Sequence, residues 1–356
     1  MKNTTHSIIA FIAKSLAMTL PVMIPALIYY FVADPFKTVK NYDPYFSDPK
    51  ATPIRLGVNK GMVSVRNLTT RQAEGIQYNA FIFGSSVSCY YDADEWASYL
   101  GEDAIPYHFD SSSESLMSMA DKVCYLDRQG TEIRYALIVL DPLVISANDS
   151  DKVPFINPPD LYNSINYLAK WLHWHYIFFT ASTNVDYLKT WIPWKLTGEK
   201  SVYGNNTIFE EQPIEYNAIT NQENMPMWDS IIANNPEQFY SIYPLIPSPD
   251  SITACPVNID SQRTEALQTI ASIFAKHHTD YQIIIGPKRS KHYLNPVDYE
   301  TLTSIFDSSR VHDYSRELAP DLESDTLMYD NTHYRPVYAS RLMKKCYTNY
   351  NNNFSK

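Results

Sequence analysis

The longest apolar run of the chain lies near its N-terminus. From Ile8 to Val32 the only charged residue is Lys14, and the 18 residues 15–32 contain none. This length is close to the minimum with which a helix crosses the hydrocarbon core of a bilayer. Tyr29 and Tyr30 lie where an interfacial aromatic belt is expected. The pattern therefore predicts a transmembrane helix.

We expect this helix to be an uncleaved anchor that occupies residues 1–34. A cleaved signal peptide is the alternative, but the apolar run is long for one and no clear small-residue cleavage site follows it. Lys2 and Lys14, on the N-terminal side, would stay in the cytoplasm. The rest of the chain would then be extracytoplasmic, in the periplasm or at the cell surface, and would begin with a juxtamembrane segment at residues 35–76.

Short apolar runs and helical patterns alternate after residue 76. Strands are predicted at 78–83 and 104–109, and the continuous apolar run 135–141 is typical of a buried parallel strand. Helices are predicted between them at 92–101 and 114–130. The second of these helices has an apolar stripe made of Leu116, Met119, Val123 and Leu126. This β-α-β-α-β order predicts a doubly wound α/β sheet.

The same alternation returns toward the C-terminus. The pattern predicts a helix at 264–278, strands at 281–287 and 309–315, and a final helix at 335–347 with Pro336 in its first turn. Residues 77–350 are therefore expected to form one α/β domain with a mostly parallel sheet flanked by helices. An aromatic helix at 158–179 lies in an insertion at about 150–255, which we expect to decorate one face or to form a small lid.

Composition narrows the range of partners. The chain has 29 basic and 39 acidic residues and a net charge of −10, which argues against a nucleic-acid partner. Its 28 tyrosines and six tryptophans fit either a surface that stacks on sugars or many half-buried positions. The four cysteines lack metal-site spacing, so we expect neither a metal nor another cofactor. They are expected to be thiols, with Cys89–Cys124 as the disulfide to test.

Two further groups of residues are expected to be structural. His173 and His175 lie in the aromatic helix, where packing is more usual than metal binding. A local basic patch follows the strand at 281–287 and includes Lys288, Arg289 and Lys291. An anionic glycan would suit such a patch, but solvation of a loop is the default interpretation.

Candidate chemistry lies at the expected carboxyl ends of the strands, where open parallel sheets bind ligands. Ser86 follows the first strand, and Gly84 permits a sharp turn before it. A serine hydroxyl is a weak nucleophile that needs a base and a group to orient that base. Asp330 and His333, three positions apart just before the last helix, supply both. The sequence therefore predicts a Ser86–His333–Asp330 triad.

These stretches resemble the signature blocks of the SGNH (GDSL-type) hydrolase superfamily. "FGSSVS" is similar to the block F-G-D-S-x-S, with Ser85 in the place of the usual Asp and Ser86 at the nucleophile, and "DNTH" matches the block D-x-x-H. The resemblance is closer to membrane-anchored members that modify envelope polymers, such as the alginate O-acetylation proteins and the D-alanyl-lipoteichoic acid transfer protein. Those members also tend to have G-S-S and an aromatic-Arg-Pro after the histidine, as at 334–336 here. The resemblance covers the anchor and the α/β core but not residues 145–255.

The chain departs from the family in its oxyanion hole. The family block G-x-N-D supplies an Asn side chain, whereas here Asp141 ends the third strand. We expect that carboxylate to hydrogen-bond backbone rather than to take part in catalysis. The second-block Gly has only a loose counterpart in the loop after the second strand, where Ser111 is the best match. The expected oxyanion donors are therefore the N–H groups of Ser86 and Ser111, with Asn148 as an outside candidate.

The resemblance implies a membrane-anchored serine acyltransferase or esterase that acts on O-acyl groups, with O-acetyl expected, of a cell-envelope or capsular polysaccharide. Its expected partners are the acylated or acceptor polysaccharide, the membrane, and a membrane-bound acyl-transfer or polysaccharide-export protein. The alternative, which the missing Asn favours, is a catalytically inactive relative that serves as a scaffold or glycan-binding subunit of a polysaccharide assembly complex. A sugar-phosphate or peptide hydrolase on the same scaffold is a third reading.

Overall fold

A five-stranded parallel sheet forms the centre of the protein. The computed structural model describes residues 2–42, 58–150, 152–153, 155–197, 202–203, 206–207 and 215–354. The strand order is β11-β9-β3-β1-β2, and every neighbouring pair is parallel. The strands are β1 (Ala80–Gly84), β2 (Pro106–His108), β3 (Tyr135–Leu140), β9 (Asp280–Ile285) and β11 (Val311–Asp313). Each overlaps a range that the apolar pattern predicts, so the expected α/β class is confirmed.

The central strand β3 shows why the sheet is continuous and buried. Its sequence is YALIVL, and none of its residues is more than 8% exposed. It pairs with β1 on one side and with β9 on the other, and both of its faces are covered. A strand with two covered faces needs apolar residues at every position rather than at alternate ones. Because the strands are parallel, the carboxyl ends of β1, β2 and β3 meet at one edge of the sheet.

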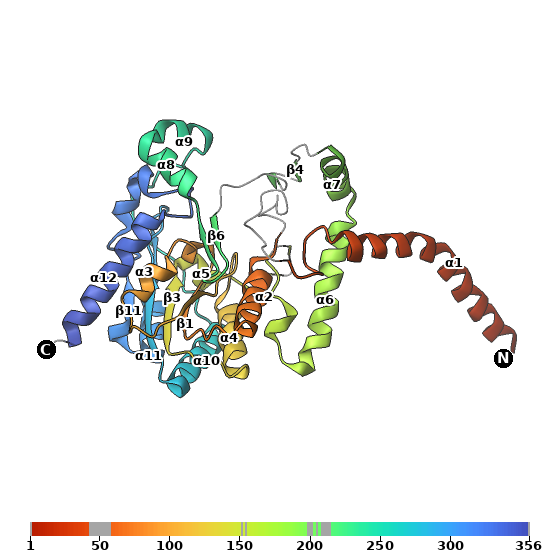
Figure 1. The fold of residues 1–356 in the computed structure, drawn as a ribbon, viewed down its shortest axis with the longest axis horizontal. Coiled ribbons are helices and arrows are strands. Elements are labelled where there is room, and N and C mark those ends of the chain that lie inside the picture. The colour runs from red at the N-terminus through yellow and green to blue at the C-terminus, as the bar shows by residue number, and fades with distance from the viewer. Residues whose placement is uncertain are drawn as a thin grey trace.

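Helices cover both faces of the sheet (Figure 1). One face packs against α2 (Lys60–Ala73), α4 (Leu116–Arg128), α10 (Ser261–His277) and α11 (Pro296–Ile305). The predicted stripe of α4 is fully buried there. The other face packs against α3 (Ala93–Ala97), α8 (Pro226–Asn234), α9 (Pro236–Ile242) and α12 (Pro336–Phe354). In β1, Phe81 and Phe83 face the first group and Ile82 faces the second, as the alternation of strand side chains requires.

Helix α2 is an element of the core that the sequence pattern does not reveal, since it lies within the segment expected to be juxtamembrane. The Asn59 side chain caps its N-terminus by accepting a hydrogen bond from Met62 N–H at 2.8 Å. Val65 and Leu68 then pack into the core beside the sheet. Much of the remaining buried surface of the helix is polar, including Lys60, so its apolar stripe is too weak to signal a core helix.

The N-terminal helix α1 (Lys2–Ala33) extends away from the domain (Figure 1). Its segment Ile8–Ala33 is long and apolar enough to span a membrane. Tyr30, near its end, is buried in a third cluster with α6 (Ser164–Ser182) and α7 (Val185–Thr197) from the insertion. That cluster also includes Phe36, Met62, Val63, Trp174, Phe178 and Tyr187. His175 donates to or accepts from the Tyr30 hydroxyl at 2.8 Å and packs on Trp171, so packing is confirmed for this histidine.

The remaining elements are short. They are η1 (Ser86–Ser88), α5 (Pro142–Ser146), η2 (Pro159–Leu161), β4 (Val202–Tyr203), β5 (Asn206–Thr207), β6 (Glu215–Asn217), β7 (Gln222–Asn224), β8 (Thr253–Ala254), β10 (His292–Tyr293), η3 (Ser308–Arg310), η4 (Ala319–Glu323) and η5 (Asp325–Leu327). The four cysteines are thiols. Cys89 and Cys346 are buried, whereas Cys124 and Cys255 are only partly buried.

Candidate active site

The turn after β1 places Ser86 at the carboxyl edge of the sheet. Gly84 is the last residue of the strand, and a Cβ there would lie 2.5 Å from the Cβ of Ser88 and 3.0 Å from the carbonyl oxygen of Val139. Only glycine therefore lets the chain turn this tightly against β3. Ser86 begins the 3₁₀ turn η1, at the position where backbone N–H groups lack intrahelical acceptors.

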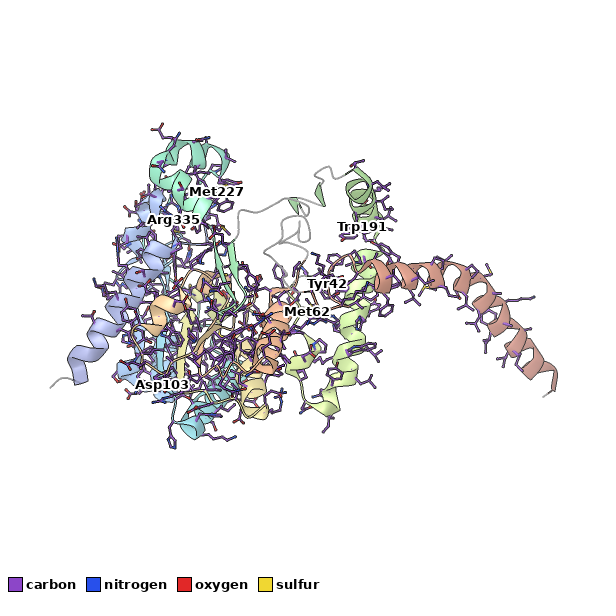
Figure 2. The ribbon with its side chains drawn as sticks, in the orientation of Figure 1. Tyr42, Met62, Asp103, Trp191, Met227 and Arg335 are labelled. Carbon is purple, nitrogen blue, oxygen red and sulfur yellow. The ribbon has the colours of Figure 1, made fainter. Side chains whose placement is uncertain are left out.

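The loop before α12 is held in place by its own side chains and by α8. Tyr329 N–H donates to the carbonyl oxygen of His333 at 2.8 Å, and Tyr334 is buried with its hydroxyl 2.8 Å from that of Tyr91. Arg335, the residue before α12, donates to the Asp229 carboxylate of α8 at 2.7 Å. Figure 2 labels Arg335 near Met227 of α8. These contacts fix the direction in which the histidine ring points.

Within this loop, Asp330 orients His333 toward Ser86. The Asp330 carboxylate accepts hydrogen bonds from Thr332 N–H at 2.7 Å and from His333 N–H at 2.8 Å, and it lies 2.8 Å from His333 Nδ1. His333 Nε2 lies 2.9 Å from Ser86 Oγ. A carboxylate only accepts, so Nδ1 donates to it and Nε2 is left to accept the serine proton. The structure thus brings together all three residues of the predicted triad.

The electrostatics of the loop keep Asp330 ionised. Partial burial of the carboxyl acts to raise its pKa, but the hydrogen bonds and charge of His333 and the two backbone N–H groups outweigh that effect and hold the pKa below its usual range. The Asp330 side chain is 52% exposed and that of His333 is 24% exposed. The pair is therefore accessible to solvent and ligands rather than sealed in the core.

A cavity of about 150 Å³ adjoins Ser86. Its apolar wall is Leu143, Val144 and Ala147, from α5 and the residue after it. Its polar wall includes Ser113, Glu114, Asp141, Lys288 and Thr332. None of the residues that line it comes from the described part of the 150–255 insertion.

At the cavity wall, the Asp141 carboxylate stabilises the N-terminus of α5. It caps α5 by accepting from Leu143 N–H at 2.7 Å and Val144 N–H at 2.9 Å, as expected for a strand-end carboxylate. Lys288 Nζ donates to its other oxygen at 3.0 Å.

The expectation that the basic patch is a solvated loop is wrong, because Lys288, Arg289 and Lys291 are at most 6% exposed. Each of the three cations pairs with a carboxylate: Lys288 with the buried Asp141, Arg289 with Asp325 and Lys291 with Glu323.

The expected oxyanion donors are only partly in place. Ser111 N–H donates to the carbonyl oxygen of Gly84 at 3.3 Å, and its hydroxyl is buried toward α2, so Ser111 is not positioned as an oxyanion donor. The polypeptide turns there, and Ser113, with a left-handed φ of +53°, lines the cavity instead. Asn148 accepts from the Arg263 guanidinium at 2.8 Å and does not line the cavity. Ser86 N–H remains as the expected donor.

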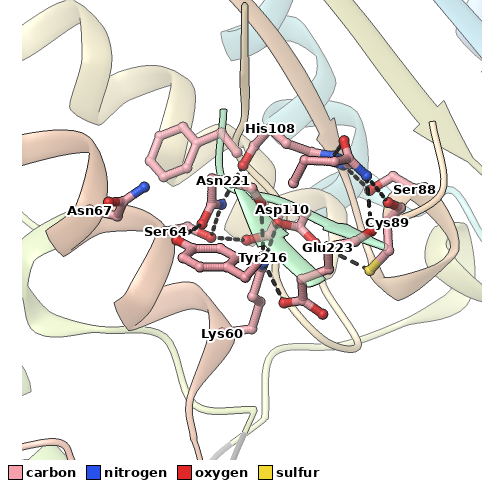
Figure 3. A network of polar contacts seen from close by, with 12 residues as sticks. Lys60, Ser64, Asn67, Ser88, Cys89, His108, Asp110, Tyr216, Asn221 and Glu223 are labelled. Carbon is pink, nitrogen blue, oxygen red and sulfur yellow. Dashed lines mark hydrogen bonds and ion pairs between the residues drawn. The ribbon is translucent and has the colours of Figure 1, made fainter. Parts of the chain in front are cut away.

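A buried polar cluster lies behind the turn (Figure 3). It is centred on Lys60, whose ammonium lies 2.6 Å from Glu223 and 3.7 Å from Asp110. Burial disfavours the charge on Lys60, but the two carboxylates outweigh it and raise the pKa of the ammonium. Burial likewise opposes ionisation of Asp110, but Lys60 prevails and lowers the pKa of that carboxyl. The cluster joins α2, the end of β2 and the β6–β7 hairpin of the insertion.

The same cluster contains a second serine–histidine pair. Ser88 Oγ lies 3.1 Å from His108 Nε2, and His108 Nδ1 lies 3.1 Å from the Gln222 side-chain oxygen. Burial lowers the pKa of His108. No sequence motif marks this cluster, because its members are isolated polar residues from four separate segments. The sequence pattern did not reveal the roles of Lys60, Glu223 and Glu114, and it placed Lys288 in a solvated loop.

Together, the fold and the site define an α/β protein with a serine, a histidine and an aspartate aligned at the carboxyl edge of a parallel sheet. No protein-family model matches the chain, and a comparison with curated proteins gave no match.

Proposed function

We propose that the protein is a membrane-anchored serine acyltransferase or esterase of the SGNH type. The observation that carries the proposal is the alignment of three groups from two distant parts of the chain. Ser86 Oγ lies 2.9 Å from His333 Nε2, and His333 Nδ1 lies 2.8 Å from Asp330. These are the contacts that general-base activation of a serine requires.

In the proposed mechanism, Ser86 Oγ attacks the carbonyl carbon of the acyl group while His333 Nε2 takes the hydroxyl proton. Asp330 stabilises the imidazolium that forms. His333 then gives the proton to the departing alcohol, which leaves Ser86 acylated. A sugar hydroxyl or water attacks this ester in the second step, again with His333 as base, and free Ser86 is restored.

The negative charge that develops on the carbonyl oxygen needs donors from the cavity wall. Ser86 N–H is the expected backbone donor at the start of η1. The Lys288 ammonium lines the same cavity, and the Asp141 carboxylate holds it at 3.0 Å, so Lys288 is a candidate second donor from the cavity wall. Leu143, Val144 and Ala147 form an apolar wall that suits a small acyl group such as acetyl.

The setting supports an envelope polysaccharide as the other substrate. Helix α1 would anchor the protein, with the catalytic domain on the extracytoplasmic side, where capsular and envelope glycans are assembled. A membrane-bound acyl-transfer or polysaccharide-export protein is the proposed partner, since an extracytoplasmic enzyme needs its acyl donor delivered across the membrane.

The direct test uses a fluorophosphonate probe on the full-length protein in detergent. The probe phosphonylates activated serines, so we expect labelling of the wild type and none of Ser86→Ala. Ser85→Ala is the matched control, because the Ser85 hydroxyl faces Val87 N–H rather than the histidine. Labelling that persists in Ser86→Ala, or maps to Ser85, would overturn the assignment.

Two contacts in the structure favour a second candidate function. Ser111 N–H is occupied by Gly84, and a capping Asp141 stands where the family has an oxyanion Asn. Losing one such donor typically costs about 10²–10³ in rate. The second candidate is therefore an inactive scaffold or glycan-binding subunit of a polysaccharide assembly complex. Folded wild-type protein that takes up no probe would favour it over the enzyme.

A further inference from the structure

Helix α6 is apolar on two opposite faces. One face, with Trp174 and Phe178, is buried in the domain. The other carries Ile165, Leu168, Leu172 and Tyr176, which are between 55% and 87% exposed. These four residues follow the spacing i, i+3, i+7, i+11, so they form a single stripe along the helix. A helix with a second, exposed apolar stripe contacts something besides its own domain.

Helix α7 repeats the pattern. Val185, Leu188, Ile192 and Leu196 have the same spacing, and Val185, Ile192 and Leu196 are 62%, 45% and 81% exposed. The opposite side holds Tyr187, which is buried. Two consecutive helices of the insertion thus carry apolar stripes with the same spacing. All four side chains are exposed on α6, whereas on α7 three are exposed and Leu188 is half-buried. Scattered surface aliphatics are common, but two matched stripes on adjoining helices indicate an interaction surface.

Both helices meet α1 at the point where it leaves the domain. The ring centroid of Trp191 on α7 lies 5.2 Å from that of Tyr29, and Trp191 is labelled beside α1 in Figure 2. His175 on α6 contacts Tyr30 and Phe31. The part of α1 before Tyr29, from Ile8 onward, has about 20 residues, or roughly 30 Å at 1.5 Å per residue, which matches a hydrocarbon core. The membrane boundary therefore falls where α6 and α7 touch α1.

The direction of the helices fits this boundary. In Figure 1, α6 runs across the part of α1 that lies next to the domain, and α1 bends farther out. A helix that crosses the anchor at the membrane boundary lies along the bilayer surface. Aromatic residues such as Tyr29, Trp171, Tyr176 and Trp191 are the types enriched at that depth.

We propose that α6 and α7 rest on the outer surface of the bilayer that α1 spans, with their exposed aliphatic stripes inserted into the headgroup boundary. These stripes contact lipid rather than another protein. The inference rests on the proposed anchoring by α1. A single spanning helix would leave the domain free to swing, whereas a second contact fixes its orientation and the height of the Ser86 site above the membrane. The enzyme would then act on polymers close to the membrane surface.

The test places an environment-sensitive NBD fluorophore at three matched positions of the full-length protein in lipid nanodiscs. Leu172→Cys probes the α6 stripe, Leu16→Cys probes α1, and Val337→Cys on α12 is the control. The three native side chains are 55%, 50% and 52% exposed. Cys124 and Cys255 are replaced by Ser in all three, while Cys89 and Cys346 stay because they are buried. Quenching by brominated phospholipids is measured, and circular dichroism verifies that each variant is folded.

We expect NBD at residues 16 and 172 to lose roughly half of its emission or more and NBD at residue 337 to lose little. Quenching at 16 without quenching at 172 would overturn the inference, because a surface reserved for a protein partner stays in water when the protein is alone. Equal quenching at 172 and 337 would overturn it too. An unquenched label at residue 16 would refute the anchor itself, and fluorophosphonate labelling tests the enzyme separately from both.

Discussion

Two serines just after β1, Ser86 and Ser88, each lie beside a histidine. Ser86 Oγ is 2.9 Å from His333 Nε2, and Ser88 Oγ is 3.1 Å from His108 Nε2. Distance alone does not separate them. Ser86 adjoins a cavity, whereas Ser88 is fully buried and its hydroxyl donates to the Ser85 carbonyl oxygen at 2.7 Å. The second serine therefore has a competing acceptor for its proton and no room for a substrate.

The histidines differ in the same sense. The second ring nitrogen of His333 meets the Asp330 carboxylate, which stabilises a positive ring, whereas that of His108 meets the neutral amide oxygen of Gln222. Burial lowers the pKa of His108 and disfavours the charged ring further. Ser86 therefore has a carboxylate behind its histidine and a cavity beside its hydroxyl, whereas Ser88 is buried against a histidine whose partner is a neutral amide. Five substitutions, two of them with matched controls, test how far this contrast extends.

The largest effect is expected from the histidines themselves. His333→Gln should slow fluorophosphonate labelling by at least about 10³-fold with little loss of stability, because the base is removed from a partly exposed position, where its side chain is 24% exposed. His108→Gln should label within about tenfold of the wild type but lose about 1–3 kcal/mol of folding free energy, since buried polar partners are left unsatisfied. Labelling rates and thermal unfolding measure both. Similar labelling losses in the two variants would erase the distinction.

The carboxylate behind the base comes next. Asp330→Asn should lower the labelling rate by about 10²–10⁴-fold, because an amide no longer stabilises the imidazolium or fixes the ring tautomer. Asp325→Asn is the matched control, since both aspartate side chains are 52% exposed and each pairs with a cation or a histidine. The control should label at the wild-type rate. An Asp330→Asn variant as fast as that control would remove Asp330 from the proposed mechanism.

The buried polar cluster should respond in stability rather than in activity. Lys60→Met leaves Asp110 and Glu223 without their shared cation and should cost about 3 kcal/mol at neutral pH. Lys60 depresses the folded-state pKa of Asp110, so this stabilisation is present above the unfolded pKa and is lost as pH falls through the folded value. The deficit of the variant should therefore shrink below about pH 4.

Lys345→Met is the control for Lys60→Met. Lys345 lies 2.6 Å from Glu317 on the surface, with side chains 32% and 63% exposed, so its loss should cost less than about 1 kcal/mol. Urea denaturation at several pH values distinguishes the two variants. A Lys60→Met deficit that stays constant with pH would show that packing, not charge, holds the cluster together.

The smallest effect concerns Glu114, which lines the cavity but is also buried beside Lys122 at 2.8 Å. Burial outweighs the lysine and raises the pKa of Glu114 to about 7. A carboxyl with a raised folded pKa favours folding fully below its unfolded pKa, and that contribution is lost as pH rises through about 7. Stability should fall between pH 5 and 8, and Glu114→Gln should flatten this slope by on the order of 1 kcal/mol. An unchanged slope in denaturation curves would mean that another group sets it.

Much of the framework was predictable because it depends on local patterns. The continuous apolar run of β3, the stripe of α4 and the uncharged run of α1 each encode an element without reference to the rest of the chain. The three triad positions were also predictable, since a Gly-Ser turn after a strand and an Asp-x-x-His before a helix are short and directional. Helix α2 was not, because its contribution to the core is largely polar.

By itself the sequence determined the alternation of strands and helices, the membrane-length helix and the identity of the three residues that meet at Ser86. Only the tertiary structure decided which serine near Gly84 has a cavity, that Ser111 turns away while Ser113 faces it, and that Lys60 and Lys288 are buried. The physical reason is the separation along the chain over which each effect acts. Apolar periodicity acts over a few residues along the chain, whereas the burial and pairing of a charge depend on partners such as Glu223 or Asp141, more than 100 positions away.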